Sequence, residues 1–160
     1  MRFQAMRRGL ETVLQKLLHA YWRFARPMTL GVRALVIDGS GCILLVKHSY
    51  ISGWHLPGGG VEPGETLGQA LARELMEEAN IELTGTPQLH GIFFNLRISR
   101  RDHVAVYVVR EFRAATTPSM CREIVARGFF ATDALPGDTT RATRARIREL
   151  LAGAPKSDAW

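Results

Sequence analysis

Three carboxylates lie within five residues of this 160-residue chain, at the spacing of one helical face. Glu74, Glu77 and Glu78 occupy positions i, i+3 and i+4, so in a helix they are neighbours that repel one another. When such acids are partly buried, they take up protons unless a cation neutralises them. Mg²⁺ and Mn²⁺ prefer oxygen ligands, so the spacing predicts a site for one of these ions. The alternative is a solvated acidic face in which Arg73 pairs with Glu77 one helical turn away.

A helix is expected to carry these acids, because the sequence specifies both of its ends. Thr66 and Gln69 have the spacing of a capping box at the N-terminus. Asn80 stands at the C-terminus, where a left-handed residue often closes a helix and where asparagine is tolerated best after glycine. At about 100° per residue, the first and third acids share the apolar stripe that begins at Leu67, and the second acid falls at its border.

Eight positions around these acids match one fixed pattern. The pattern is a glycine, five residues, a glutamate, seven residues, and then Arg-Glu-aliphatic-x-Glu-Glu-x-Gly-aliphatic. The matching residues are Gly59, Glu65, Arg73, Glu74, Leu75, Glu77, Glu78 and Ile81. The segment resembles the Nudix box, the signature of the Nudix hydrolases. Asn80 stands where the family has glycine, which affects the exit from the helix and not the carboxylates.

The resemblance implies an α/β chain with the Nudix fold, an α/β/α sandwich around a mixed β-sheet, here with an extra N-terminal helix. We expect residues 1–28 to form a basic amphipathic extension, residues 29–152 the Nudix hydrolase domain and residues 153–160 a flexible tail. With 46% apolar residues, the chain is long enough for one core but not for two. No apolar run approaches the roughly 20 residues of a membrane span, and two cysteines make no disulfide framework. A cytoplasmic protein is therefore expected.

The implied reaction is Mg²⁺-dependent hydrolysis of the pyrophosphate linkage in a nucleoside diphosphate joined to another moiety. ADP-ribose, nucleotide sugars, dinucleoside polyphosphates and nucleoside triphosphates are all candidate substrates, and Mn²⁺ is a possible substitute for Mg²⁺. By analogy with the family, Arg73 orients a carboxylate and Glu65 braces the loop against the helix. The implied metal ligands are Glu74, Glu77, Glu78 and the carbonyl of Gly59, and the implied catalytic residues are Glu74, Glu78, Arg73 and Glu65.

Candidate substrate-binding residues outside the box are less constrained. They are Lys47, Trp54, Arg97, Arg101, Glu111 and Glu123. Glu111 and Glu123 are candidate general bases beside Glu74, because relatives recruit an acid from outside the box. The arginines at a hairpin tip and Lys47 at a strand end could contact phosphate, but solvated positions would explain them as well. Trp54 could stack on a base or pack in the core.

Apolar runs predict strands on both sides of the acidic helix. The expected strands are residues 29–38, 42–48, 88–98, 104–112 and 123–130, and the expected closing helix is 139–151. Gly39-Ser40-Gly41 predicts that the first two strands form a hairpin, and the third and fourth should form a second one. In the closing helix, Ile147, Leu150 and Leu151 should face inward.

The net charge of +6 is concentrated at the N-terminus, where residues 1–27 carry +5. Residues 9–26 are expected to form a helix with one apolar and one basic side. Packing on the domain or on a second copy is the main interpretation, so a homodimer through this helix is possible; contact with a membrane surface or nucleic acid is the alternative. A nucleic-acid partner is not expected, because the remainder of the chain carries only +1.

Other functions stay open beside hydrolysis of a small nucleotide. A Nudix domain that only senses a nucleotide would not need the whole acid set. Hydrolysis at RNA 5′ ends is kept open by the basic N-terminal helix. A Nudix-like isomerase acting on an isoprenoid diphosphate would require a cysteine near the metal and a longer chain.

Overall fold

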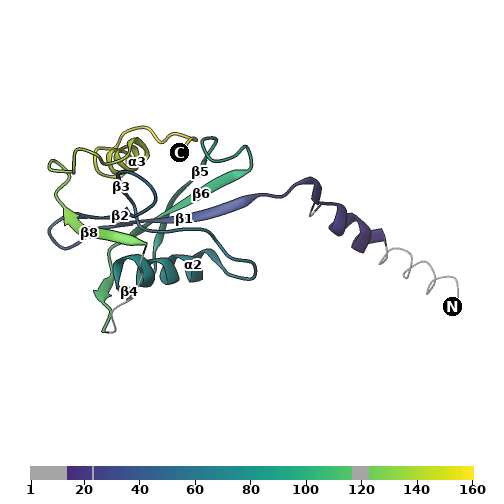
Figure 1. Cartoon of the computed structure of the whole chain (residues 1–160), viewed down its shortest axis with the longest axis horizontal. Coiled ribbons are helices and arrows are strands. Elements are labelled where there is room, and N and C mark those ends of the chain that lie inside the picture. Colours follow the sequence, from purple (N-terminus) through teal and green to yellow (C-terminus); the bar gives the residue numbers. More distant parts are fainter. Residues whose placement is uncertain (1–13, 23, 117–122) are drawn as a thin grey trace, which may run out of the picture.

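The computed structural model describes residues 14–22, 24–116 and 123–160 (Figure 1). Its strands lie between two helices, with α2 on one side and α3 on the other, and η1 is a π-helix that continues α2. The elements are β1 (Thr29–Val36), β2 (Ile43–His48), β3 (Trp54–His55), α2 (Leu67–Glu74), η1 (Leu75–Ala79), β4 (Ile81–Leu83), β5 (Gln88–Phe94), β6 (Asp102–Val109), β7 (Phe112–Ala114), β8 (Ile124–Phe130) and α3 (Arg141–Leu151).

The strand pairing is mixed, as expected. β1 runs parallel to β6, with Thr29 opposite Asp102 and Val36 opposite Val109, and β6 runs antiparallel to β5. The second three-stranded sheet has the order β3-β2-β8 and is antiparallel, and β4 pairs with β7. The predicted hairpin of β5 and β6 is confirmed, as is the α/β/α arrangement around mixed sheets.

The first predicted hairpin is wrong in its pairing, although its turn is where the sequence places it. The carboxylate of Asp38 accepts hydrogen bonds from the backbone N–H groups of Ser40 and Cys42, both at 2.9 Å. Beyond this turn only the bridge between Ile37 and Ile43 joins the two runs, because β1 pairs with β6 and β2 pairs with β8. Neighbouring residues in the sequence determine the turn. The pairing of apolar strands that are covered on both faces depends instead on how they are buried in the whole domain.

The core is divided into two clusters, and β1 supplies both. Val32, Ala34 and Val36 pack under α2, whereas Leu35 and Ile37 belong to the cluster under α3. This alternation follows from the two-residue period of a strand. Because both faces of β1 are covered, its position is fixed, and so is the position of any side chain that it presents to a cleft.

The closing helix differs from prediction in which residues it buries. Ile147 is buried as expected, but Leu151 is exposed and Arg146 is 1% exposed. The Arg146 guanidinium lies 3.7 Å from the ring centroid of Phe93, and its Nη2 donates to Glu149 Oε1 at 2.6 Å. This acid and this ring explain how a cation is accommodated at a buried position of α3.

The C-terminal segment, expected to be a flexible tail, packs along β5 and α3. The backbone N–H of Phe94 donates to the carbonyl of Asp158 at 2.8 Å, and the N–H of Trp160 donates back to Phe94 at 2.9 Å. The N–H of Ser157 donates to Glu149 Oε1 at 3.1 Å. The single acidic side chain of α3 therefore holds both Arg146 and the tail.

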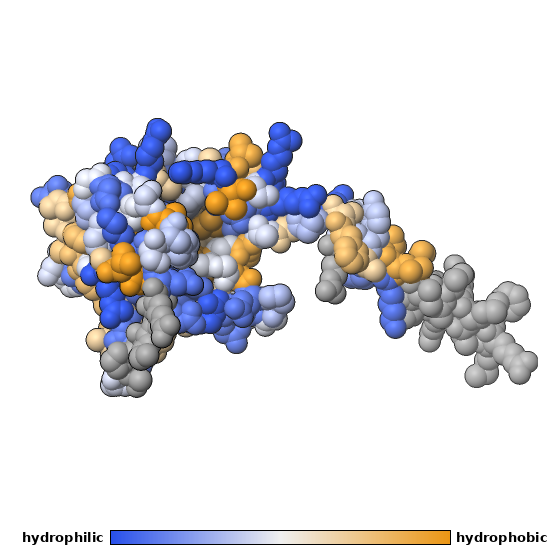
Figure 2. Space-filling view, viewed as in Figure 1, coloured by the Kyte–Doolittle hydropathy of each residue, from blue (hydrophilic) through white to orange (hydrophobic). Residues whose placement is uncertain are grey.

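Residues 14–22 and 24–25 are helical and extend away from the domain (Figure 1). The predicted helix begins at residue 9, and its first five residues lie outside the described part of the chain. Leu14, Leu17 and Tyr21 are exposed, and Figure 2 shows apolar surface along this arm. The expectation that the helix packs on the domain is therefore not met. In the described residues no helix is long and apolar enough to cross a membrane.

Candidate functional site

The acidic helix begins and ends as predicted. The Thr66 side chain accepts from the N–H of Gln69 at 3.2 Å, and the Gln69 side chain accepts from the N–H of Thr66 at 2.9 Å, which confirms the capping box. Asn80 has φ 59° and ψ 44°, the expected left-handed geometry. The last turn, η1, is a π-helix, which the sequence did not indicate; such turns are frequent at functional sites.

Two of the three acids reach a common cleft of about 450 Å³. Glu74 is 8% exposed and Glu78 is 7% exposed, and both line this cleft. The side chain of Glu77 is 51% exposed and does not line it. The helical wheel predicted this division between the apolar stripe and its border. The solvated-face interpretation therefore holds for Glu77 alone.

A glycine loop closes one wall of the cleft. A Cβ on Gly58, whose φ is +135°, would lie 2.1 Å from the carbonyl oxygen of Val32, and a Cβ on Gly59 would lie 2.4 Å from Glu74 Oε1. The N–H of Gly58 donates to Glu78 Oε2 at 2.7 Å, and the N–H of Val32 donates to the Gly59 carbonyl at 2.9 Å. The loop is thus pinned to β1 and lies directly against both carboxylates.

Arg73 connects the loop to the acids. Its Nε and Nη2 donate to the two carboxylate oxygens of Glu65 at 2.9 and 3.0 Å, and its Nη1 donates to Glu74 Oε1 at 2.7 Å. Nη2 also donates to the carbonyl of Gly60 at 3.0 Å, whereas Glu77 Oε2 is 3.6 Å from Nη1. The hydrogen bond from Arg73 holds the pKa of Glu65 below its usual value. Arg73 therefore fixes the orientation of one cleft carboxylate.

Glu78 is the electrostatically perturbed acid of the cleft. Burial raises its pKa to about 7, against the opposing effects of the Gly58 N–H and Arg33. Glu74 and Glu123 contribute to the rise, because both are negative charges nearby. A cation that enters the cleft would stabilise the charged form of this desolvated carboxyl, which its acidic neighbours disfavour.

Two further residues at the site were missed by the sequence analysis. Arg33 lies on β1, lines the cleft, and donates from Nη1 to the carbonyls of Leu56, at 3.1 Å, and Gly58. His48 Nε2 lies 3.5 Å from Glu78 Oε1, and burial, with Arg33 and His55, lowers the pKa of His48 to about 4. Within the described residues neither ring nitrogen of His48 has a hydrogen-bond partner. An arginine inside an aliphatic strand was a usable signal; a histidine at a strand end was not.

The candidate substrate-binding residues outside the box differ in whether they line the cleft. Glu123 lines the cleft, whereas Lys47 pairs with Asp138 at 2.9 Å. Trp54 packs edge-on against Phe130, with ring centroids 4.8 Å apart. Arg97 and Arg101 are exposed near the turn between β5 and β6 and do not line the cleft.

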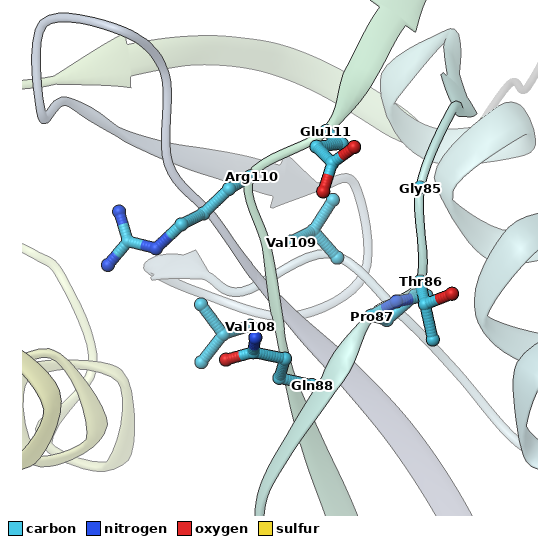
Figure 3. Close-up of a pocket in the computed structure, with 8 residues that line it drawn as sticks. All are labelled: Gly85, Thr86, Pro87, Gln88, Val108, Val109, Arg110 and Glu111. Atoms are coloured by element: carbon cyan, nitrogen blue, oxygen red, sulfur yellow. The ribbon is translucent and has the colours of Figure 1, made fainter.

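Glu111 lies beyond the far end of β6. It lines a separate hollow of about 60 Å³, where its carboxyl sits beside Gly85 (Figure 3). Asp102, at the start of β6, lines the large cleft. The eight residues of β6, at about 3.3 Å each, separate Glu111 from that end by more than roughly 20 Å. Of the two general-base candidates from outside the box, Glu123 therefore lies at the cleft and Glu111 does not.

The cleft offers oxygen donors to a cation. In the part of the chain that the structure describes, no three His, Cys, Asp or Glu side chains already converge on one position. Glu74, Glu78 and Glu123 nevertheless line one cleft with the Gly59 backbone, without thiolates. These oxygen donors suit hard ions such as Mg²⁺ and Mn²⁺ better than soft ones. A cation among them would also stabilise the charged form of the desolvated Glu78.

Comparisons with known proteins agree with this geometry. A family model described as "NUDIX domain" matches residues 27–151. A Bacillus subtilis (strain 168) protein with the provisional name 8-oxo-dGTP diphosphatase is 46% identical over 76 residues, which are 48% of this chain and 50% of that protein. Diphosphoinositol polyphosphate phosphohydrolase 2 of Rattus norvegicus is 46% identical over 70 residues, 43% of this chain and 38% of that protein. This chain therefore spans half or less of the length of these two relatives.

A solved structure extends the similarity over about three quarters of the chain. The crystal structure of a MutT NUDIX hydrolase from Burkholderia pseudomallei superposes with a TM-score of 0.65 and 28% sequence identity. The superposition covers 76% of this chain and 97% of that one.

Proposed function

Since this chain belongs to the NUDIX domain family, we propose that it hydrolyses the pyrophosphate linkage of a nucleoside diphosphate joined to another moiety, with Mg²⁺ or, as a substitute, Mn²⁺. The observation that carries this proposal is the burial of Glu74 and Glu78 together in one open cleft. The substrates proposed are ADP-ribose, nucleotide sugars, dinucleoside polyphosphates or nucleoside triphosphates. The name of the Bacillus subtilis relative supports a nucleotide. A cytoplasmic location is part of the proposal.

In this proposal Glu74 and Glu78 hold the metal, with Glu77 and the Gly59 carbonyl beside them. The carbonyl already accepts the N–H of Val32, and its second lone pair is left for a cation. A bound divalent cation supplies charge neutralisation at the phosphate oxygens and makes an attacking water easier to deprotonate. Glu77 would have to turn inward from its exposed rotamer to join the set.

Arg73 and Glu65 act as positioning residues. Their bidentate pair holds the guanidinium so that Nη1 fixes Glu74, and Nη2 fixes the glycine loop through the Gly60 carbonyl. Arg33 lies at the same cleft, where its positive charge can face a phosphate once the acids are neutralised. Glu123 is the proposed general base from outside the box, because it lines the cleft, with Glu74 as the alternative.

The test is hydrolysis of a panel of these compounds with Mg²⁺, using the wild type and Glu78→Gln. We expect at least one compound to be hydrolysed and kcat to fall by about 10² or more in the variant. Glu62→Gln is the matched control, because the same change at an exposed loop position should leave kcat unaltered. Equal turnover by wild type and Glu78→Gln would refute the metal assignment. Binding of a nucleotide without turnover of any compound would support a sensor, and release of pyrophosphate only from triphosphorylated RNA would support the RNA 5′-end alternative.

A further inference from the structure

The N-terminal helix carries an apolar face that nothing in the described chain covers (Figure 2). Leu14 is 56% exposed and Leu17 is 62% exposed. At about 100° per residue, the apolar side chains fall within an arc of roughly 160°. Those exposed on this arc are Leu14, Leu17, Leu18, Tyr21, Trp22 and Phe24. A helix this short has only marginal stability in water by itself. A surface that covers this arc would therefore also stabilise the helix.

The charge around this arc has one sign. No Asp or Glu occurs between residues 12 and 37, and residues 1–27 carry a net charge of +5. Lys16 and Arg26 project outside the apolar arc, and the Arg26 guanidinium lies 4.1 Å from the ring centroid of Trp22. A partner that covers the arc and also neutralises its flank must be apolar and anionic at once.

A second copy of this helix meets only the first requirement. It would offer the same apolar arc, but residues 12–37 of that copy are equally basic and contain no acid. A bilayer with anionic headgroups offers both an apolar layer and negative charge. Tyr21 and Trp22 are also the residue types enriched at membrane interfaces. We propose that this helix docks the protein on an anionic lipid bilayer, lying in the plane of its surface.

The same geometry places the cleft close to the membrane. The last helical residue described is residue 25, and Thr29 and Leu30 already line the cleft. The four Cα–Cα steps from residue 25 to Thr29 span at most about 14 Å. The mouth of the cleft therefore lies near the headgroups when the helix is docked.

The test is flotation of the full chain with vesicles of phosphatidylcholine containing about 30% phosphatidylglycerol, compared with phosphatidylcholine alone. We expect about tenfold stronger partitioning onto the anionic vesicles, weakening as NaCl is raised from about 50 to about 500 mM. Leu14→Gln with Leu17→Gln should lower partitioning about tenfold, because the apolar arc loses two side chains. The matched control is Leu89→Gln with Ile92→Gln, the same kind of change at residues 53% and 52% exposed on β5.

A second pair of variants tests the charge. Lys16→Gln with Arg26→Gln should lower partitioning onto anionic vesicles about 30-fold, which corresponds to about 1 kcal/mol for each of the two basic residues near the surface. Arg141→Gln with Arg148→Gln removes two exposed charges from α3 and should have no comparable effect.

Oligomeric state, measured by sedimentation equilibrium without lipid, separates docking on a bilayer from self-association. Equal partitioning onto neutral and anionic vesicles would overturn the proposal. So would a dimer that Leu14→Gln with Leu17→Gln abolishes while the wild type fails to bind vesicles. Neither result depends on hydrolysis, so failure of the lipid proposal is distinguishable from failure of the proposed enzyme activity.

Discussion

Replacing Glu78 with glutamine should change how the stability of the metal-free protein depends on pH. Burial raises the pKa of Glu78 to about 7, so the folded protein binds this proton more tightly than the unfolded chain does. The stabilisation is therefore fully present below the ordinary pKa of a glutamate and is lost as pH rises through about 7. Glutamine fills the same space and does not titrate.

The magnitude follows from the shift. One pKa unit corresponds to about 1.4 kcal/mol, so a rise from 4.5 to about 7 corresponds to roughly 3 kcal/mol in total. The part that falls between about pH 6 and about pH 8 is on the order of 1 kcal/mol. His48, whose pKa is lowered to about 4, destabilises the folded protein as pH falls below about 6.5, which overlaps the lower end of this window. Because His48 is present in wild type and in Glu78→Gln, the difference between the two proteins reports the titration of Glu78.

The measurement is urea unfolding in EDTA at pH 6, 7 and 8. From pH 6 to pH 8 the free energy of unfolding of wild type and of Glu62→Gln should fall by about 1 kcal/mol relative to that of Glu78→Gln. Added Mg²⁺ should flatten the wild-type profile, because the ion binds the deprotonated carboxylate. Parallel profiles for wild type and Glu78→Gln in EDTA would refute the assignment of this titration to the cleft acid.

Three further outcomes follow from individual contacts. Gly59→Ala should lower kcat about tenfold or more, because its Cβ would lie 2.4 Å from the nearest carboxylate oxygen, whereas Gly60→Ala, with no atom within 4 Å, should be neutral. Arg73→Lys should lower kcat by about 10 to 10², since lysine does not reproduce the bidentate contact; an unchanged kcat would contradict its positioning role. Arg146→Ala should cost about 3 to 5 kcal/mol in urea unfolding, because a buried carboxylate loses its partner, and equal stability of Arg146→Ala and the exposed Arg148→Ala would contradict this.

The acidic helix was predictable because its signals are local. The capping box of Thr66, the left-handed Asn80 and the wheel positions of the acids lie within one stretch of sequence, and the structure reproduces them. The π-helical turn was not predictable in this way, since the stretch carries no kink signal such as proline. The burial of Glu74 and Glu78 followed from the wheel, but the depth of the cleft did not.

The rest of the cleft depends on contacts between distant segments, and local patterns could not supply them. Glu111 and Glu123 both adjoin apolar strands, and only the topology distinguishes them. Glu123 accepts the N–H of Ser49 through its backbone carbonyl at 2.8 Å, which places it at the end of β2 that carries His48. The same topology puts Arg33 at the cleft, because β1 pairs with β6 and not with β2.

The packing of the C-terminal segment also affects how the folded protein avoids self-association. β5 is the outer strand of its sheet, and exposed strand edges are templates for intermolecular pairing. Residues 158–160 occupy the backbone N–H and carbonyl of Phe94, so that end of the edge is closed to a neighbouring molecule. β5 also presents Leu89 and Ile92 to solvent. Loss of residues 158–160 would therefore expose an unpaired strand edge beside apolar side chains, where aggregation can begin.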